Sequence, residues 1–359
     1  MSDRLLVASR KGLIDYRRKG AGRWEIARTS FLGSPVSQTL KDPRDGTLYA
    51  ALDLGHFGVK LHRSSDDGAT WEEIAAPSYE GIGEGEDAPS LKLIWAIETG
   101  GPDEPGVLWA GTIPGGLFRS EDKGSTWTLN RPLWDEPARA AWFGGGYDKP
   151  GVHSVCVDPR DSKVVTIGVS IGGVWETRDG GKSWAVGGKG LWAAYMPPGE
   201  EGKPGNQDIH RLVRCAAAPD VLWIQHHNAA FRSAAGFDAF KEIKPQPSVF
   251  GFPVACHPSD PLTAWFTPAV KDEFRYPVDQ RMVVSRTCDG GKSFEVLREG
   301  LPQEGSFDLI YRHGLVVDET GERLAMASTT GNLWISENGG DAWSEISGHL
   351  PPVYAVRWA

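Results

Sequence analysis

A short motif recurs along the chain and constrains the fold more than any other feature. Its pattern is Ser/Thr-x-Asp-x-Gly-x-Ser/Thr-aromatic, with Asn338 and Ala342 as substitutions in the last copy. Five copies occur, at residues 64–71, 120–127, 177–184, 287–294 and 336–343. Weaker copies at 16–24 and 233–240 keep only part of the motif and its closing aromatic residue. The seven closing aromatics define seven repeat units, and an array of this kind predicts a repeat architecture.

The residue types of the motif point to a structural turn. A carboxylate and a hydroxyl can accept backbone N–H groups inside a tight turn. Glycine supplies the positive φ that such a turn needs. The aromatic residue is expected to anchor the turn onto the strands. We therefore interpret the motif as turn chemistry and not as a catalytic constellation.

Each unit is expected to contain four strands. In the fourth unit these are residues 152–157, 163–169, 173–177 and 183–186, which are rich in Val, Ile and Trp. Gly, Pro and Asp separate them, as is typical of strands joined by turns. The chain has 45 Gly and 25 Pro in 359 residues. Both are above the usual ~7% and ~5%. Four strands per unit, repeated radially, predict an all-β, seven-bladed β-propeller.

The two ends of the chain are expected to share one blade. Residues 5–9 look like a second strand, and residues 353–358 look like the innermost strand that this blade lacks. Pairing them would join the first unit to the last and remove an open sheet edge. We therefore predict one propeller domain that spans residues 1–359.

Charge and composition restrict the partners. Lys and Arg total 38 and Asp and Glu total 47, a formal net charge of -9. Such a surface disfavours nucleic acid and anionic membranes as partners. The apolar run after Met1 is shorter than the ~7–15 residues of a signal peptide. No stretch approaches the ~18 apolar residues of a membrane helix. We expect a cytoplasmic protein, and we expect its four Cys, which form no CxxC pair, to be free thiols.

The motif resembles the Asp-box, or BNR repeat, of sialidases, xyloglucanases, sortilin-type receptors and photosystem II assembly factors. Over nearly all its length the chain resembles the bacterial WD40/YVTN/BNR-like proteins that are described as sialidase-like or glycosyl-hydrolase-like. This resemblance implies the propeller fold. It specifies function weakly, because one fold hosts many chemistries.

The resemblance does not carry sialidase residues onto this chain. Sialidases have six blades and a Phe-Arg-Ile-Pro motif ahead of the first box. Phe274-Arg275-Tyr276-Pro277 is similar, but it lies between the fifth and sixth repeats. Xyloglucanases of this type pair two propellers around a cleft, whereas these repeats account for one.

The functional face is expected where the loops between second and third strands meet the loops between blades. Histidines from several units map to this face, and such clustering indicates a metal site or acid/base chemistry. We assign four as candidate ligands of a divalent transition metal (Zn, Fe, Mn or Cu): His56, His153, His210 and His226. Alternation at a strand end places His226 and His227 on opposite sides, and we prefer His226. A metal-free polar pocket and a network of loop hydrogen bonds are the alternatives.

Other candidates on this face are charged or aromatic. We predict His210, Glu273 and Arg275 as catalytic groups. The predicted substrate-binding residues are Arg312, Gln225, Asn228, Trp142 and Tyr311. Eight carboxylates could form a hydrolytic pair, of which at most two are expected to act: Asp53, Asp135, Glu136, Asp148, Asp208, Asp272, Glu273 and Asp308. Aromatic residues in the loops around 134–147 and 192–195 could bind sugar rings or form small loop cores. Residues 84–87 belong to another loop of this face.

Two functions follow from these candidates. The first is a small-ligand-binding propeller with a polar, His-rich central pocket. It would be a metal-assisted hydrolase or lyase, or a glycosidase-like hydrolase, acting on a small molecule or a carbohydrate. The second is a non-catalytic scaffold that holds a protein partner, as the resemblance to assembly factors implies.

Overall fold

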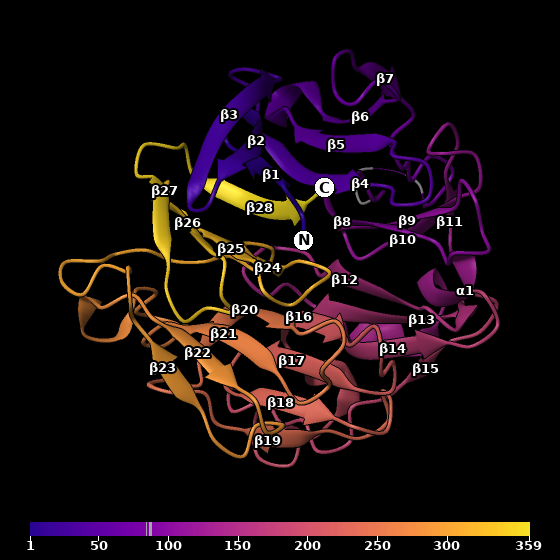
Figure 1. Cartoon of the computed structure of the whole chain (residues 1–359). Coiled ribbons are helices and arrows are strands. Elements are labelled where there is room, and N and C mark those ends of the chain that lie inside the picture. The colour runs from indigo at the N-terminus through magenta and orange to yellow at the C-terminus, as the bar shows by residue number, and fades with distance from the viewer. Residues whose placement is uncertain (84, 86–87) are drawn as a thin grey trace.

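The computed structural model describes residues 1–83, 85 and 88–359. Part of the loop expected at residues 84–87 therefore lies outside the described residues. Seven four-stranded antiparallel sheets are arranged in a ring around a central axis (Figure 1). The predicted seven-bladed propeller is confirmed.

The strands follow one another blade by blade. Blade 1 contains β28 (Val353–Trp358), β1 (Arg4–Ser9), β2 (Gly12–Gly20) and β3 (Arg23–Ser30). Blade 2 contains β4 (Val36–Lys41), β5 (Leu48–Asp53), β6 (Val59–Ser64) and β7 (Glu72–Ile74). Blade 3 contains β8 (Leu93–Thr99), β9 (Leu108–Ile113), β10 (Leu117–Ser120) and β11 (Thr128–Leu129). Blade 4 contains β12 (Gly151–Asp158), β13 (Asp161–Ser170), β14 (Gly173–Thr177) and β15 (Ala185–Val186).

The remaining blades repeat this order. Blade 5 contains β16 (Ile209–Arg214), β17 (Leu222–His226), β18 (Ala230–Ser233) and β19 (Lys241–Ile243). Blade 6 contains β20 (Gly251–Cys256), β21 (Ala264–Pro268), β22 (Val284–Thr287) and β23 (Glu295–Leu297). Blade 7 contains β24 (Leu315–Val317), β25 (Leu324–Ala327), β26 (Leu333–Ser336) and β27 (Ser344–Ser347).

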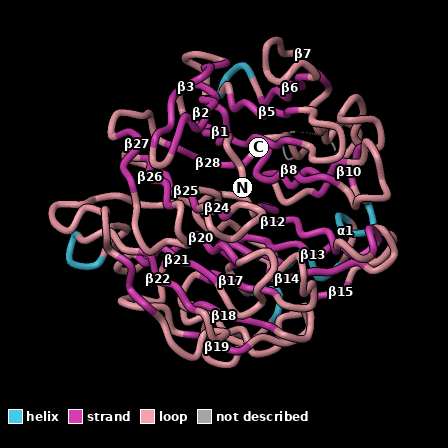
Figure 2. The backbone as a smooth tube through the Cα atoms, in the orientation of Figure 1, coloured by secondary structure: helices cyan, strands magenta, loops and turns pink. Residues whose placement is uncertain are grey.

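Helices are few and short (Figure 2). Within the described ranges they are α1 (Arg131–Trp134) and the 3-10 helices η1 (Gly55–Phe57), η2 (Pro137–Ala141), η3 (Pro204–Asn206) and η4 (Val278–Gln280). None of the helices in the described part of the chain has the length and apolar character needed to cross a bilayer.

The first and last strands close the ring. The innermost strand of blade 1 is β28, which pairs antiparallel with β1 and places Val7 opposite Val356. In Figure 1 this is the contact between the yellow C-terminal strand and the indigo N-terminal strands. The predicted closure is confirmed, and it removes an unpaired sheet edge.

Apolar side chains fill each gap between neighbouring blades. Tyr49 of blade 2 and Phe118 of blade 3 belong to one buried cluster, and Leu5 of blade 1 shares another with Ala325 of blade 7. One such cluster occurs at each of the seven interfaces around the ring. Burying this apolar surface is the main force that holds the blades together.

The recurrent motif forms the turn between the third and fourth strands. In blade 4 Asp179 accepts hydrogen bonds from Ser183 N (2.9 Å), Ser183 Oγ (2.6 Å) and Thr177 Oγ1 (2.8 Å). Thr177 Oγ1 in turn accepts from Gly181 N, where φ is 91°. The Trp184 indole reaches back to blade 3 and donates to Asn130 Oδ1 at 2.9 Å. The motif is thus a turn that also fastens one blade to the previous one.

Candidate functional site

A cavity of about 610 Å³ opens at one end of the central axis. Every blade contributes to it, from Tyr354 on β28 of blade 1 to Arg312, which precedes β24 of blade 7. The aromatic side chains in its lining are Trp95, Tyr147, Tyr195, Phe252, Tyr311 and Tyr354. The ionisable groups other than Tyr are Asp53, Asp208, His210, His227, Asp272, Arg275, Arg312 and His313. A cavity of this size with convergent polar groups is typical of a small-molecule site.

The innermost strands place these residues. The first residues of β4, such as Gln38, line this cavity, and Pro43, just beyond its end, lines a second hollow of about 480 Å³. The strand β8 behaves likewise, with Trp95 at the cavity and Thr99 at the second hollow. The two hollows therefore lie at opposite ends of the axis, and the site occupies the face on which the innermost strands begin.

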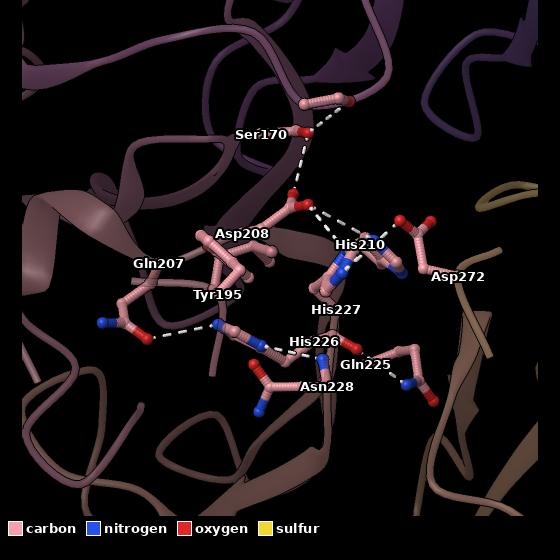
Figure 3. Close-up of polar contacts among 12 residues, drawn as sticks. Ser170, Tyr195, Gln207, Asp208, His210, Gln225, His226, His227, Asn228 and Asp272 are labelled. Atoms are coloured by element: carbon pink, nitrogen blue, oxygen red, sulfur yellow. Dashed lines mark hydrogen bonds and ion pairs between the residues drawn. The ribbon is translucent and has the colours of Figure 1, made fainter. Parts of the chain in front are cut away.

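A cluster of three side chains lies in blade 5 (Figure 3). Asp208 immediately precedes β16, His210 is the second residue of β16, and His227 immediately follows β17. Asp208 Oδ2 lies 3.5 Å from His210 Nε2 and 3.3 Å from His227 Nδ1. The three side chains converge because β16 and β17 are neighbours in the same sheet.

Each of the three side chains also makes a contact with a residue outside the cluster. Ser170 Oγ donates to Asp208 Oδ1 at 2.9 Å, and His210 Nδ1 lies 2.6 Å from the Gly251 carbonyl oxygen. His227 Nε2 lies 3.8 Å from Asp272 Oδ2. These contacts, drawn in part in Figure 3, fix the orientation of the carboxylate and of both imidazole rings.

Burial and neighbouring charges set the ionisation of the cluster. Burial by itself would raise the pKa of Asp208, but the nearby imidazoles of His210 and His227 hold that pKa well below its ordinary value. Burial lowers the pKa of His210 despite the opposing effect of Asp208. The carboxylate is therefore an anion at neutral pH, and the His210 imidazole is neutral.

Two arginines line the same cavity in different ways. Arg275 forms an ion pair with Asp272, with Nη2 2.5 Å from Oδ1. The Arg312 guanidinium lies 4.8 Å from the Trp95 ring centre and 5.3 Å from that of Phe252. Its Nη2 is 3.4 Å from Ser170 Oγ, and its Nε is buried with no hydrogen-bond partner. Within the described residues Arg312 has no carboxylate ion-pair partner, so its charge is available to a ligand.

Polar side chains close the inner end of the cavity. Gln38 Nε2 lies 2.9 Å from His313 Nδ1, and His313 Nε2 lies 2.9 Å from the His153 carbonyl oxygen. Arg211, which lines the second hollow, donates to that same oxygen at 3.3 Å. Burial keeps the pKa of His153 and of His313 well below the ordinary value, so both are neutral. These residues fill the axis between the two hollows.

Several predicted site residues lie at the cavity and others do not. His210, Arg275, Arg312 and Tyr311 all line it. Glu273 does not: it is largely exposed and pairs with Lys271, while its neighbour Asp272 faces inward.

The other predicted substrate-binding residues hold loops or fill a core. Gln225 is buried and donates to the backbone oxygens of His226, Ala229 and Val249. Asn228 bonds to Ala194 N and the Trp192 oxygen, which ties a between-blade loop down. Trp142 is buried in the cluster between blades 3 and 4, its ring centre 5.6 Å from that of Trp175. The small-core alternative, and not a sugar platform, therefore describes its position.

The structure does not bring the four predicted metal ligands together. His56 is exposed in η1, outside the cavity lining. His153 uses both ring nitrogens, on the Ile209 oxygen (2.5 Å) and Ser154 Oγ (3.0 Å). His226 is buried, with Nε2 3.2 Å from Gln207 Oε1. It is His227, the residue we did not prefer, that faces the cavity, since the last residue of β17 points into the blade and the next one out of it.

The predicted catalytic, binding and metal residues do not include Asp208, Trp95 or Phe252, which all line the cavity. Asp208 is among the eight candidate carboxylates, and its position two residues before His210 is the sequence feature that could have singled it out. Trp95 and Phe252 are in the innermost strands β8 and β20, where alternation also allows a core position. Phe252 stacks on His210, with ring centres 4.4 Å apart and planes inclined by 11°.

Comparison with known proteins relates the chain to two groups. No family model matches it. It is 31% identical over 188 residues to a probable oligoxyloglucan-reducing end-specific xyloglucanase of Neosartorya fischeri. It is 36% identical over 148 residues to the oligoxyloglucan-reducing end-specific xyloglucanase of Emericella nidulans. These alignments span 47% and 40% of this chain but only 21% and 16% of the relatives.

Solved structures show the same fold at low sequence identity. The Niastella koreensis GH74 enzyme matches 95% of this chain with a TM-score of 0.64 and 16% identity, over 51% of its own length. YCF48 from Cyanidioschyzon merolae matches 88% of this chain with a TM-score of 0.56 and 13% identity, over 87% of its own length. The chain is thus a seven-bladed propeller similar to GH74 xyloglucanases and to YCF48. At these identities the structural likeness concerns the fold alone.

Proposed function

We propose that the chain is a glycosidase-like hydrolase that binds a carbohydrate in the axial cavity. The observation that carries this proposal is the convergence of aromatic rings and ionisable side chains from around the ring in one cavity of about 610 Å³. Aromatic faces suit the apolar faces of sugar rings, and carboxylates suit their hydroxyl groups. The sequence similarity to xyloglucanases supports the same class of reaction.

The arginines favour a carbohydrate that carries an acidic group. Arg312 presents a cation that no described carboxylate neutralises, and it lines the cavity together with Trp95, over whose ring it lies. A guanidinium binds a planar carboxylate through two parallel hydrogen bonds. A uronic acid unit combines that carboxylate with a sugar ring. Arg275, already paired with Asp272, would orient the acid/base groups beside it.

The blade 5 cluster supplies groups for proton transfer. Hydrolysis needs a water that loses a proton and a leaving oxygen that gains one. The Asp208 carboxylate is ionised at neutral pH. His227 lies within 4 Å of both Asp208 and Asp272. His227 can therefore pass a proton between the reacting oxygens and a carboxylate. His210 keeps its predicted place in the reaction, while Asp272 takes the place that Glu273 was expected to fill.

The test is a hydrolysis screen with matched variants. Neutral xyloglucan oligosaccharides and oligosaccharides that contain uronic acid would be incubated with the protein, and new reducing ends counted. We expect release from an acidic substrate. Asp208→Asn should lower turnover by at least ~10²-fold, the usual contribution of a proton-transfer group. Glu304→Gln, an exposed carboxylate outside the cavity lining, is the control and should keep full turnover. Equal turnover in Asp208→Asn would contradict the proposal.

The scaffold function has one observation in its favour. The match to YCF48 extends over 87% of that protein, whereas the match to the Niastella koreensis enzyme covers about half of it. Another solved structure similar to this chain is YCF48 bound to D1 peptide, with a TM-score of 0.53. If no carbohydrate binds or is cleaved, a scaffold that holds a protein segment becomes the preferred function.

A further inference from the structure

Three donor atoms of the blade 5 cluster point at one another. They are Asp208 Oδ2, His210 Nε2 and His227 Nδ1, and all three lie within 4.8 Å of one another. The separations from Asp208 are 3.5 Å and 3.3 Å. Ligand atoms bound at 2.0–2.2 Å to one metal ion are about 3.0–3.5 Å apart, so the two separations from Asp208 have the spacing of a metal site.

The contacts behind the cluster indicate which atoms are free. A carbonyl oxygen can only accept, so His210 Nδ1 donates its proton to Gly251, which leaves Nε2 as the ring atom that can present a lone pair. Asp208 Oδ1 accepts from Ser170, which leaves Oδ2 free. His227 Nε2 faces Asp272, which leaves Nδ1. Outer partners of this kind, a backbone carbonyl and a carboxylate, hold imidazole ligands in metalloproteins.

A lone pair that faces a carboxylate at this distance requires a positive charge between them. An ion bound to both Asp208 Oδ2 and His210 Nε2 would supply that charge. The simplest other source of charge is a proton shared between the two side chains. A shared proton, together with a hydrogen bond from His227 Nδ1 to the same carboxylate oxygen, is the rival arrangement that the titration below separates from a bound ion.

We propose that Asp208, His210 and His227 form a binding site for a single divalent transition metal ion. Two nitrogens and one carboxylate oxygen suit Zn²⁺ and Mn²⁺. Three protein ligands leave coordination positions open, and the side chains of all three ligands line the cavity. An oxygen of the bound molecule or a water can take those positions while Arg312 binds a neighbouring anionic oxygen. This goes beyond the proposed function, because the donor atoms define the ion whatever the substrate is. With the ion bound, His227 is a ligand and no longer passes protons.

The experiment is metal titration of the whole chain, purified without a His tag, treated with EDTA and dialysed. Calorimetry with Zn²⁺ should show one equivalent bound, and Co²⁺ should give a visible absorption spectrum of a coordinated ion. His227→Ala removes a direct ligand, so it should weaken Zn²⁺ binding by more than ~100-fold. Asp272→Asn removes an outer partner and should weaken binding by ~10–100-fold. His349→Ala, an exposed imidazole between β27 and β28, is the matched control and should bind as the wild type does.

The results separate the metal site from its rivals. No binding of Zn²⁺, Mn²⁺ or Co²⁺ to the wild type would overturn the inference and leave a shared proton between Asp208 and His210. Unchanged binding in His227→Ala would also overturn it, because the ion would then lie elsewhere. Near-UV circular dichroism checks folding, and His227→Gln replaces the alanine variant if that variant unfolds. Metal binding is measured without any substrate, so a failed hydrolysis screen does not affect this test.

Discussion

The turns at the outer rim and the cavity at the axis use similar residue types for opposite purposes. At the rim Asp66 and Asp179 make the same hydrogen bonds in different blades. At the axis Asp208 precedes the first strand of blade 5 alone, and its partners Ser170, His210 and His227 come from β13, β16 and the residue after β17. Repetition marks the residues that hold the ring together, whereas departure from it marks the residues that give one end of the ring its chemistry.

The largest expected effect on stability is at the rim. Trp343, the closing aromatic of blade 7, is buried in the cluster between blades 6 and 7. Trp343→Ala should lower the free energy of unfolding by ~3–5 kcal/mol because it leaves a cavity. The measurement is equilibrium unfolding in urea. Tyr311→Ala, at the mouth of the cavity and 38% exposed, is the comparison and should cost less than ~1 kcal/mol. Equal losses would break the distinction between rim and axis.

A smaller effect is expected from the carboxylate of a single turn. Asp289 accepts from Lys292 N, Ser293 N and Ser293 Oγ, so Asp289→Ala leaves these donors without a partner and should lower the melting temperature. Asp289→Asn should change it much less. The reason is that Asn338 already fills this position in blade 7, where its Oδ1 accepts from Ala342 N at 3.0 Å. A thermal unfolding series compares the two variants, and equal losses would show that the negative charge itself is required.

At the axis a stability change of the opposite sign is expected. Arg312→Met removes a cation that has no ion-pair partner among the described residues and keeps the packing between Trp95 and Phe252. The free energy of unfolding should stay the same or rise by up to ~1 kcal/mol, because functional residues are often not optimal for stability. Binding of glucuronate, measured by calorimetry, should be lost in the same variant. A clear loss of stability would instead assign Arg312 to the structural residues.

The smallest effect concerns acid stability. Backbone and side-chain hydrogen bonds from Thr70, followed by Ser64, lower the pKa of Asp66 to about 2. In the unfolded chain the pKa is about 3.9, so the contribution is complete above about pH 4 and is lost as the pH falls toward 2. Asp66→Asn should therefore flatten the dependence of the urea midpoint on pH below 4. An unchanged slope would mean that other carboxylates control acid unfolding.

The sequence predicts the ring well and the site only in part. Five of the turns repeat in sequence because each has to satisfy the same local hydrogen bonds, and together with the two partial copies they indicate seven blades. The site depends on which of two adjacent side chains points inward at a strand end, and this alternation can be read in either register. That is why His227 and not His226, and Asp272 and not Glu273, face the cavity. Trp142 shows the same limit, since a loop aromatic can cover a core as readily as a ligand.

The polar residues across the axis have a consequence for how a bound molecule enters and leaves the cavity. Gln38, His313 and His153 make the cavity a blind end, although a propeller has a central channel. A molecule that reaches Asp208 must leave by the mouth through which it came. A long chain cannot be threaded through the ring and processed as it passes. Only the terminus of a long chain, or a molecule small enough to fit whole, can be held there, and a bound molecule has to leave before the next one can enter.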